Sequence, residues 1–302
     1  MTSLTGGLPR QEAVEWDCIL DAKAAGAEMP VWVEDDNALY WADLLGRSVN
    51  RLDIFSSINR RWEMPEMVGT FALCPDRSKA LIALRTGLFK LDLGTSKLSP
   101  LVDAPYDTEN YHFNDGRCDA DGRFWVGTMR SSGSSLPNGG AAWYRFDGNG
   151  LSRQIDDTTI ANGLAWSPDG RTMYVADRPN WQILAFDYDT DKSIPSGRRI
   201  FARVPEGQIP DGAAIDRDGG YWIALFGAGR IVKFSPDGQL ERDLKAPTMH
   251  PTNIAFGGNG HSTMFVTTAR ILADVEAEPL AGGLFCADVK ACGFPEPFCQ
   301  VI

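Results

Sequence analysis

The stretch "NGLAWSPDGRTMYVAD" (residues 162–177) contains two short apolar runs on either side of a Pro-Asp-Gly turn. Alternating Val, Ile, Trp, Tyr and Phe bounded by such a turn predict two antiparallel strands joined as a hairpin. The same pattern occurs five more times. The other copies are "EMPVWVEDDNALYWAD" from Glu28, "GTFALCPDRSKALIAL" from Gly69, "NDGRCDADGRFWVGTM" from Asn114, "DGAAIDRDGGYWIALF" from Asp211 and "NIAFGGNGHSTMFVTT" from Asn253.

The six copies are spaced regularly along the chain. Their first residues lie 41, 45, 48, 49 and 42 positions apart, and a turn residue follows seven positions after each of them. A further strand-like motif follows each hairpin, as in "LFKLD", "WYRFD" and "ILAFD". At least three strands in about 45 residues is the repeat of a propeller blade. We therefore predict an all-β fold, a six-bladed β-propeller.

The repeat accounts for residues 1–302 as a single domain, with residues 1–13 as a flexible or peripheral N-terminal segment. Two strand-like stretches lie outside the repeats, "EAVEWDCILDA" near the start and "PFCQVI" at the end. We expect one of them to complete a blade begun at the other end of the chain, because ring closure removes an exposed sheet edge. The Gly- and Ser-rich stretch from Ser131 to Gly140 is interpreted as a surface loop, with a mobile lid as the alternative.

Composition excludes several classes of protein. A net charge of −11 and a pI near 4.8 argue against nucleic acid or an anionic membrane surface as a partner. Neither a signal peptide nor an apolar run long enough to cross a bilayer is visible in the sequence. The six cysteines lack zinc-site spacing, so we expect mostly buried, reduced thiols and a cytoplasmic protein.

The first position of each repeat suggests the functional site. The innermost strand of a blade lines the central channel, so these six positions converge at one end of it. They are occupied by Glu28, Gly69, Asn114, Asn162, Asp211 and Asn253. Oxygen donors of this kind suit a divalent cation, whose charge relieves the repulsion between carboxylates. Asn or Asp before Gly is also a common turn residue, and Asn114 or Asn162 alone would be explained that way.

The quoted repeats, "FNDGRCDADGRFWVGTM" and "NGLAWSPDGRTMYVAD" in particular, resemble the gluconolactonase/regucalcin (senescence marker protein-30) family over nearly the whole chain. The resemblance implies hydrolysis of a sugar lactone to the aldonic acid, with one divalent metal ion (Ca, Zn, Mn, Mg or Fe(II)). It implies Glu28, Asn162 and Asp211 as the metal ligands, Asp211 as the general base and Asn114 as a substrate contact. A metal-bound hydroxide is an alternative to Asp211 as the base.

This chain departs from the family pattern at two places. The family motif "GEGP" is "AEMP" here, so we expect Met29 to narrow the pocket, and a family Arg is replaced by His112, which we expect to contact substrate. His250 and His261 are interpreted as surface residues, and Asp43 and Asp177 as structural. Two other functions remain open on the same fold. They are a metal-dependent esterase or organophosphate hydrolase, and a non-catalytic Ca²⁺-binding propeller.

Overall fold

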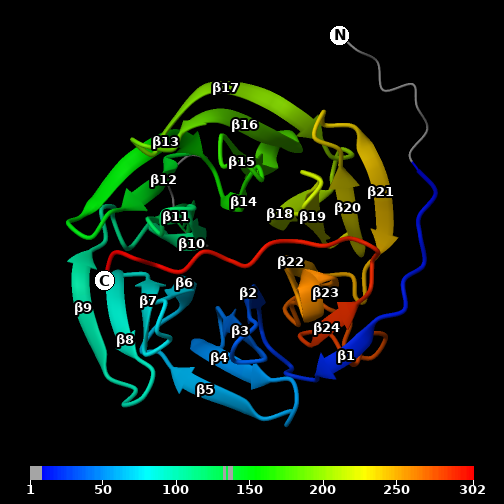
Figure 1. The fold of residues 1–302 in the computed structure, drawn as a ribbon, viewed down its shortest axis with the longest axis horizontal. Helices are drawn as coiled ribbons and strands as arrows, with labels where there is room; N and C mark the ends of the chain where they lie inside the picture. The colour runs from blue at the N-terminus through cyan, green and yellow to red at the C-terminus, as the bar shows by residue number, and fades with distance from the viewer. Residues whose placement is uncertain (1–8, 132–133, 135–138) are drawn as a thin grey trace.

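The computed structural model describes residues 9–131, 134 and 139–302, and its strands form a ring of six four-stranded antiparallel sheets (Figure 1). The all-β six-bladed propeller is thus confirmed, with four strands in each blade. In the described part of the chain, the only helical turns are two short 3-10 segments, η1 (Arg178–Asn180) and η2 (Asn259–His261), and no helix is long and apolar enough to span a membrane.

The blades follow one another along the chain, and each begins with its innermost strand. Blade 1 holds β2 (Ala27–Val33), β3 (Ala38–Asp43), β4 (Ser48–Asp53) and β5 (Asn59–Glu63). Blade 2 holds β6 (Val68–Leu73), β7 (Lys79–Leu84), β8 (Gly87–Asp92) and β9 (Leu98–Asp103). Blade 3 holds β10 (Tyr111–Cys118), β11 (Phe124–Arg130), β12 (Ala141–Phe146) and β13 (Leu151–Thr158).

The second half of the ring is built in the same way. Blade 4 holds β14 (Ala161–Trp166), β15 (Thr172–Asp177), β16 (Gln182–Asp189) and β17 (Ile194–Arg203). Blade 5 holds β18 (Ile209–Ile215), β19 (Tyr221–Phe226), β20 (Arg230–Phe234) and β21 (Leu240–Lys245). Blade 6 holds β22 (Pro251–Gly257), β23 (Thr263–Thr268), β24 (Leu284–Ala287) and, from the other end of the chain, β1 (Asp17–Leu20).

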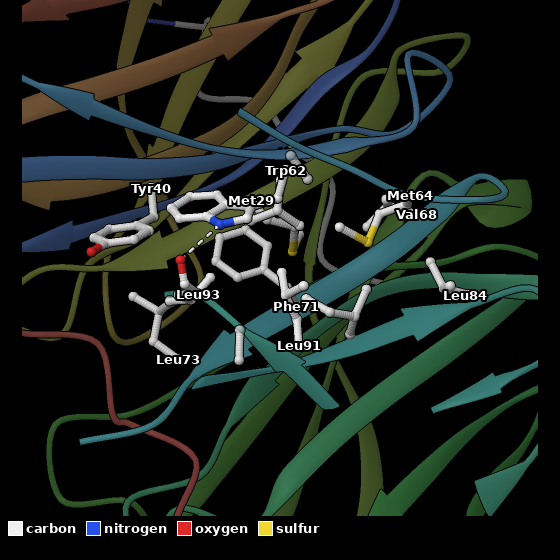
Figure 2. Close-up of a cluster of buried hydrophobic side chains, with 14 of the residues drawn as sticks. Met29, Tyr40, Trp62, Met64, Val68, Phe71, Leu73, Leu84, Leu91 and Leu93 are labelled. Atoms are coloured by element: carbon white, nitrogen blue, oxygen red, sulfur yellow. Dashed lines mark hydrogen bonds between the residues drawn. The ribbon is translucent and has the colours of Figure 1, made fainter. Parts of the chain in front are cut away.

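The hydrophobic core is divided among the six blade interfaces. Six clusters of buried side chains are present, and each joins two neighbouring blades. Figure 2 shows the cluster between blades 1 and 2, where Trp62 also donates a hydrogen bond from Nε1 to the carbonyl oxygen of Leu93 at 3.1 Å. Strands buried on both faces explain why "YWIALF" of β19 reads as a continuous apolar run.

The N-terminal strand closes the ring. β1 pairs antiparallel with β24 and covers the free edge of blade 6, so the first of the two candidate terminal stretches completes the blade. Before reaching β1, the chain pairs Glu12 with Leu244 of β21 and forms a Glu12–Arg242 ion pair, which ties residue 12 to blade 5. Residues 1–8 lie outside the described part, as do positions 132–133 and 135–138 of the Gly- and Ser-rich stretch.

The C-terminal segment takes a different path, crossing the middle of the ring (Figure 1). Residues 294–297 line a cavity together with the last residues of inner strands, among them Cys118 of β10 and Ile215 of β18. Arg117 of β10 forms an ion pair with Glu296 at 3.1 Å. Because the inner strands all run in the same direction from their first residue, this segment covers the end of the channel opposite to those first residues.

The sequence also carried expectations about the cysteines and two of the histidines. All six cysteines are free thiols, of which Cys74, Cys118 and Cys299 are buried and Cys18 is exposed. The interpretation of His261 as a surface residue is wrong, because His261, the last residue of η2, is only 4% exposed. His250 is half-buried, and its ring packs against Phe226 with a centroid separation of 4.8 Å.

Removing residues 1–20 should destabilise the whole ring, because it exposes the edge of β24 and breaks the contacts of Glu12 with blade 5. We expect the midpoint of thermal unfolding to fall by roughly 10 °C or more, with increased aggregation. Calorimetry and light scattering measure both effects. A truncated chain that melts within about 2 °C of the full chain would show that β1 does not close the ring.

Candidate functional site

Each inner strand has a β-bulge or irregular register at its mouth end, involving or adjoining the residue that begins the sequence repeat. The pairing register shifts between Glu28 and Val31, between Asn114 and Gly116, and between Asn162 and Ala165, and equivalent shifts occur in β6, β18 and β22. A bulge re-aims the side chain at which the pairing breaks. The repeat therefore positions six equivalent residues around one end of the channel, called here the channel mouth.

One of the six positions carries no side chain, for a steric reason. A Cβ atom on Gly69 would lie 2.5 Å from the carbonyl oxygen of Phe113 in the neighbouring inner strand. Glycine is required there by the close approach of β10 to β6. Polar side chains occupy the five other positions.

Two of these side chains are directly linked. Asn114 donates one hydrogen bond from Nδ2 to the Oδ1 atom of Asn162 at 3.0 Å and another to the carbonyl oxygen of Ala161 at 2.8 Å. The pair of bonds fixes the orientation of both carboxamides. Since a carboxamide oxygen has two lone pairs, Oδ1 of Asn162 keeps capacity for a second interaction.

The carboxylates at the channel mouth perturb one another. Burial raises the pKa of Glu28 well above its usual range, and the charges of Asp211 and Asp115 raise it further. Burial likewise raises the pKa of Asp211 to about 7, where the positive charge of Arg178 opposes the shift and the charge of Asp115 adds to it. The charge of Asp115 raises the pKa of both Glu28 and Asp211, so the three carboxylates share one electrostatic environment.

Asp115 is a site residue that the sequence did not indicate. It follows Asn114 in the bulge with a φ of 54°, an unusual conformation for a residue other than glycine. Its carboxylate, 6% exposed, accepts hydrogen bonds from the backbone N–H groups of Gly116 at 2.7 Å and Leu164 at 3.2 Å. Asp115 is the second residue of its repeat, and the repeat pattern distinguishes only the first.

Asn253, whose position the repeat did identify, also takes part in this environment. Its side chain hydrogen-bonds Glu28 and lowers the pKa of that carboxyl, against the larger effect of burial. A Cβ atom on Gly212 would lie 2.1 Å from the Asn253 carboxamide carbon, so the side chain packs directly on the residue after Asp211.

His112 lies on β10, two residues before Asn114, and is 8% exposed. Its Nδ1 atom lies 3.0 Å from Oγ of Ser131, at the start of the Gly- and Ser-rich stretch. Burial, and secondarily the charge of Arg85, lower the pKa of His112 to about 4. The imidazole is therefore neutral at pH 7, where it can hydrogen-bond but carries no charge.

The structure does not place Met29 at the channel mouth. Its side chain is 7% exposed and belongs to the hydrophobic cluster between blades 1 and 2, with Tyr40 and Phe71 (Figure 2). The expectation that Met29 narrows the pocket is therefore corrected. With a φ of 54°, Met29 occupies the bulge position after Glu28, and its side chain is directed into the blade interface.

Asp43 and Asp177 have structural roles, as expected. Asp43 accepts hydrogen bonds from the backbone N–H groups of Gly26 at 3.0 Å and Gly46 at 2.9 Å. Asp177 accepts hydrogen bonds from the side chains of Asn180 at 2.9 Å and Gln182 at 2.6 Å.

The donor set fits a hard divalent cation. Within residues 9–131, 134 and 139–302, no group of three or more His, Cys, Asp or Glu side chains is placed to hold a metal ion without other ligands. The predicted metal ligands are two carboxylates, of Glu28 and Asp211, and the carboxamide oxygen of Asn162. All three are oxygen ligands, which Ca²⁺, Mg²⁺ and Mn²⁺ prefer, and a cation would relieve the repulsion that raises both pKa values.

Comparisons with known proteins agree with this architecture. The chain is 36% identical to a 6-deoxy-6-sulfogluconolactonase of Pseudomonas putida, over 93% of this chain and 97% of that one. It is 34% identical to an L-arabinolactonase of Azospirillum brasilense, over 91% and 92% of the two chains. Among solved structures, it is similar to the calcium-binding protein regucalcin of Agrobacterium tumefaciens, with a TM-score of 0.89, 26% identity, and coverage of 95% and 98%.

The model of one protein family, described as the SMP-30/Gluconolactonase/LRE-like region, matches residues 26–270, which span the chain from the first inner strand to the end of β23. The chain belongs to the SMP-30/gluconolactonase/LRE-like family.

Proposed function

We propose that this protein hydrolyses a sugar lactone to the corresponding aldonic acid, using one divalent metal ion held by Glu28, Asn162 and Asp211. The observation that carries the proposal is the set of mutually repelling carboxylates, flanked by carboxamides, at one end of a closed channel. Membership of a family whose relatives are named as lactonases supports the reaction class. The free thiols and the acidic surface suit a cytoplasmic protein with a small-molecule substrate.

A divalent ion bound by these ligands would supply positive charge that polarises the lactone carbonyl. Hydrolysis adds water to the carbonyl carbon and breaks its bond to the ring oxygen. Asp211, at the channel mouth beside the other proposed ligands, is assigned as the group that accepts the proton of the attacking water and returns it to the ring oxygen.

Substrate orientation is assigned to Asn114 and His112. The carboxamide of Asn114 is fixed by its bonds to Ala161 and Asn162, and the neutral imidazole of His112 can donate or accept a hydrogen bond from a sugar hydroxyl. Of the two lactonase relatives, one is named for a sulfonated sugar and the other for arabinose, which carries no anionic group. These names do not identify the sugar on which this protein acts.

Replacing Glu28 by Gln or Asp211 by Asn should lower kcat/KM for lactone opening by about 100-fold or more, because each change removes a charged ligand at little cost in volume. Acid release from a panel of aldonolactones measures the activity. Treatment with a chelator should abolish it in the wild-type protein, and a panel of divalent ions then identifies the ion that restores it.

Two outcomes would replace the proposal. Metal-replete protein that opens no lactone but hydrolyses phosphotriesters would be an organophosphate hydrolase. Protein that does neither, and in which Glu28→Gln changes only Ca²⁺ affinity, would be a binding module. Asp177→Asn serves as a matched control, since Asp177 has hydrogen-bond partners of its own at the end of β15.

The stability of the metal-free protein should fall as pH rises from about 4 to 7. Asp211 has a pKa of about 7 in the folded protein, above its usual value of 3.8, so between these values the folded chain binds more protons than the unfolded chain. Ionisation of the buried carboxylate therefore costs stability above pH 7. Metal-free Asp211→Asn should melt a few degrees higher than the wild type at pH 8.

Calorimetry at pH 5 and pH 8, with and without added metal, measures this effect. Metal should raise the melting temperature of the wild-type protein at pH 8 and have little effect on Asp211→Asn. If the metal-free variant melts lower than the wild type at pH 8, Asp211 stabilises the fold by contacts of its own.

A further inference from the structure

We propose that Arg178 binds an anionic substituent of the substrate, so that the preferred class is sugar lactones carrying an oxyanion such as a sulfonate, phosphate or carboxylate. This inference rests on the proposed function and specifies its substrate. It concerns the part of the lactone remote from the ester carbonyl.

The position of Arg178 follows from the pairing of blade 4. In the hairpin of β14 and β15, Ala161 lies opposite Asp177 and Asn162 lies opposite Ala176. Arg178 is the next residue of the chain after β15, so it leaves the sheet at the channel mouth beside Asn162. There it begins η1, which packs against β18, the strand that carries Asp211.

The charge of Arg178 reaches the site without being neutralised there. Arg178 begins η1, which contacts the strand that carries Asp211, yet no carboxylate oxygen lies within 4.0 Å of its guanidinium in the described part of the chain. The guanidinium donates no hydrogen bond to a described residue either, and only the backbone carbonyl of Arg178 is bonded, to the N–H of Trp181. Asp177, the acid next to it in sequence, is already bonded to Asn180 and Gln182.

A simpler role would be to offset the negative charge of the carboxylates. An arginine offsets the charge of a carboxylate most strongly when the two are in direct contact. Arg230 contacts Asp243 in this way, and Arg117 contacts Glu296. Arg178 stands apart from Asp211 and is half-buried, with its five N–H donors available. A guanidinium presented in this way matches the geometry of an oxyanion, which it can bind through two parallel hydrogen bonds.

Two other polar atoms at the channel mouth also lack partners. The Oε1 atom of Gln208, immediately before β18, and the Nδ1 atom of His250, immediately before β22, are buried and unbonded in the described structure. Buried polar atoms without partners are costly, and a polar ligand can satisfy them. Near the starts of the inner strands of blades 5 and 6, the described structure thus leaves two buried polar atoms without partners, in addition to the guanidinium of Arg178.

The experiment compares four aldonolactones that share one sugar and differ only at the exocyclic carbon, which carries a hydroxyl, a sulfonate, a phosphate or a carboxylate. The metal-replete full chain is assayed for kcat/KM on each. The informative quantity is the ratio of kcat/KM for an anionic lactone to kcat/KM for the neutral one. This ratio cancels any effect of Arg178 on the pKa of Asp211, which acts on all four substrates.

In the wild-type protein we expect at least one anionic lactone to exceed the neutral lactone, and the strongest of the three identifies the oxyanion. Arg178→Gln should lower that ratio by about 10- to 100-fold, mainly through KM, because it removes a charge-assisted bidentate contact. Arg178→Lys, which keeps the charge but not the planar fork, should retain an intermediate ratio. Melting temperatures of both variants confirm that they are folded.

Arg199→Gln is the matched control, since Arg199 lies on β17 of the same blade and pairs with Asp187 at 2.7 Å. Its ratio should equal that of the wild type. The inference is overturned if the wild-type ratio is near one for all three anions. It is also overturned if Arg178→Gln leaves the ratio unchanged, or if Arg199→Gln lowers it equally. The shared sugar is the one opened fastest in the aldonolactone panel, and a protein that opens no lactone of that panel would contradict the proposed function itself, and the inference with it.

Discussion

The burial of three carboxylates is the constraint on which the channel mouth depends. Glu28, Asp115 and Asp211 come from blades 1, 3 and 5, and each has its pKa raised chiefly by burial. Burying one ionised carboxylate is costly, and burying several together is more so. Such an arrangement persists only because the surrounding ring is fixed independently by its six interblade hydrophobic clusters. The core thus stabilises an electrostatically unfavourable site that a cation and a polar substrate would relieve.

The breaks in pairing register at the mouth ends of the inner strands direct polar side chains toward the channel mouth. In a regular strand, side chains alternate between the two faces of the blade and pack against the neighbouring blades, as Phe71 and Ala72 of β6 do on opposite sides. A break in register frees one residue from that alternation and directs it along the channel. The same irregularity explains Met29, whose neighbour Glu28 belongs to the site while Met29 packs in the core.

The sequence predicted the fold because each blade contains a local pattern, a hairpin with its turn, that recurs every 41 to 49 residues. It also predicted that Glu28, Asn162 and Asp211 occupy equivalent places near the start of their inner strands, since the repeat relates them by symmetry. It could not predict Asp115 or Arg178, because both lie one or more positions away from the repeated register. Their importance comes from contacts between blades, which depend on bulge geometry. The buried position of His261 likewise results from η2, which replaces the regular turn in blade 6.

The C-terminal segment limits access to the channel from one end. It covers the far end of the channel and is held there by the ion pair of Arg117 with Glu296 and by the backbone bond from Cys299 to the carbonyl of Leu73. If a lactone binds at the channel mouth as proposed, the lactone and the acid formed from it would enter and leave on the mouth side, because this segment crosses the opposite end.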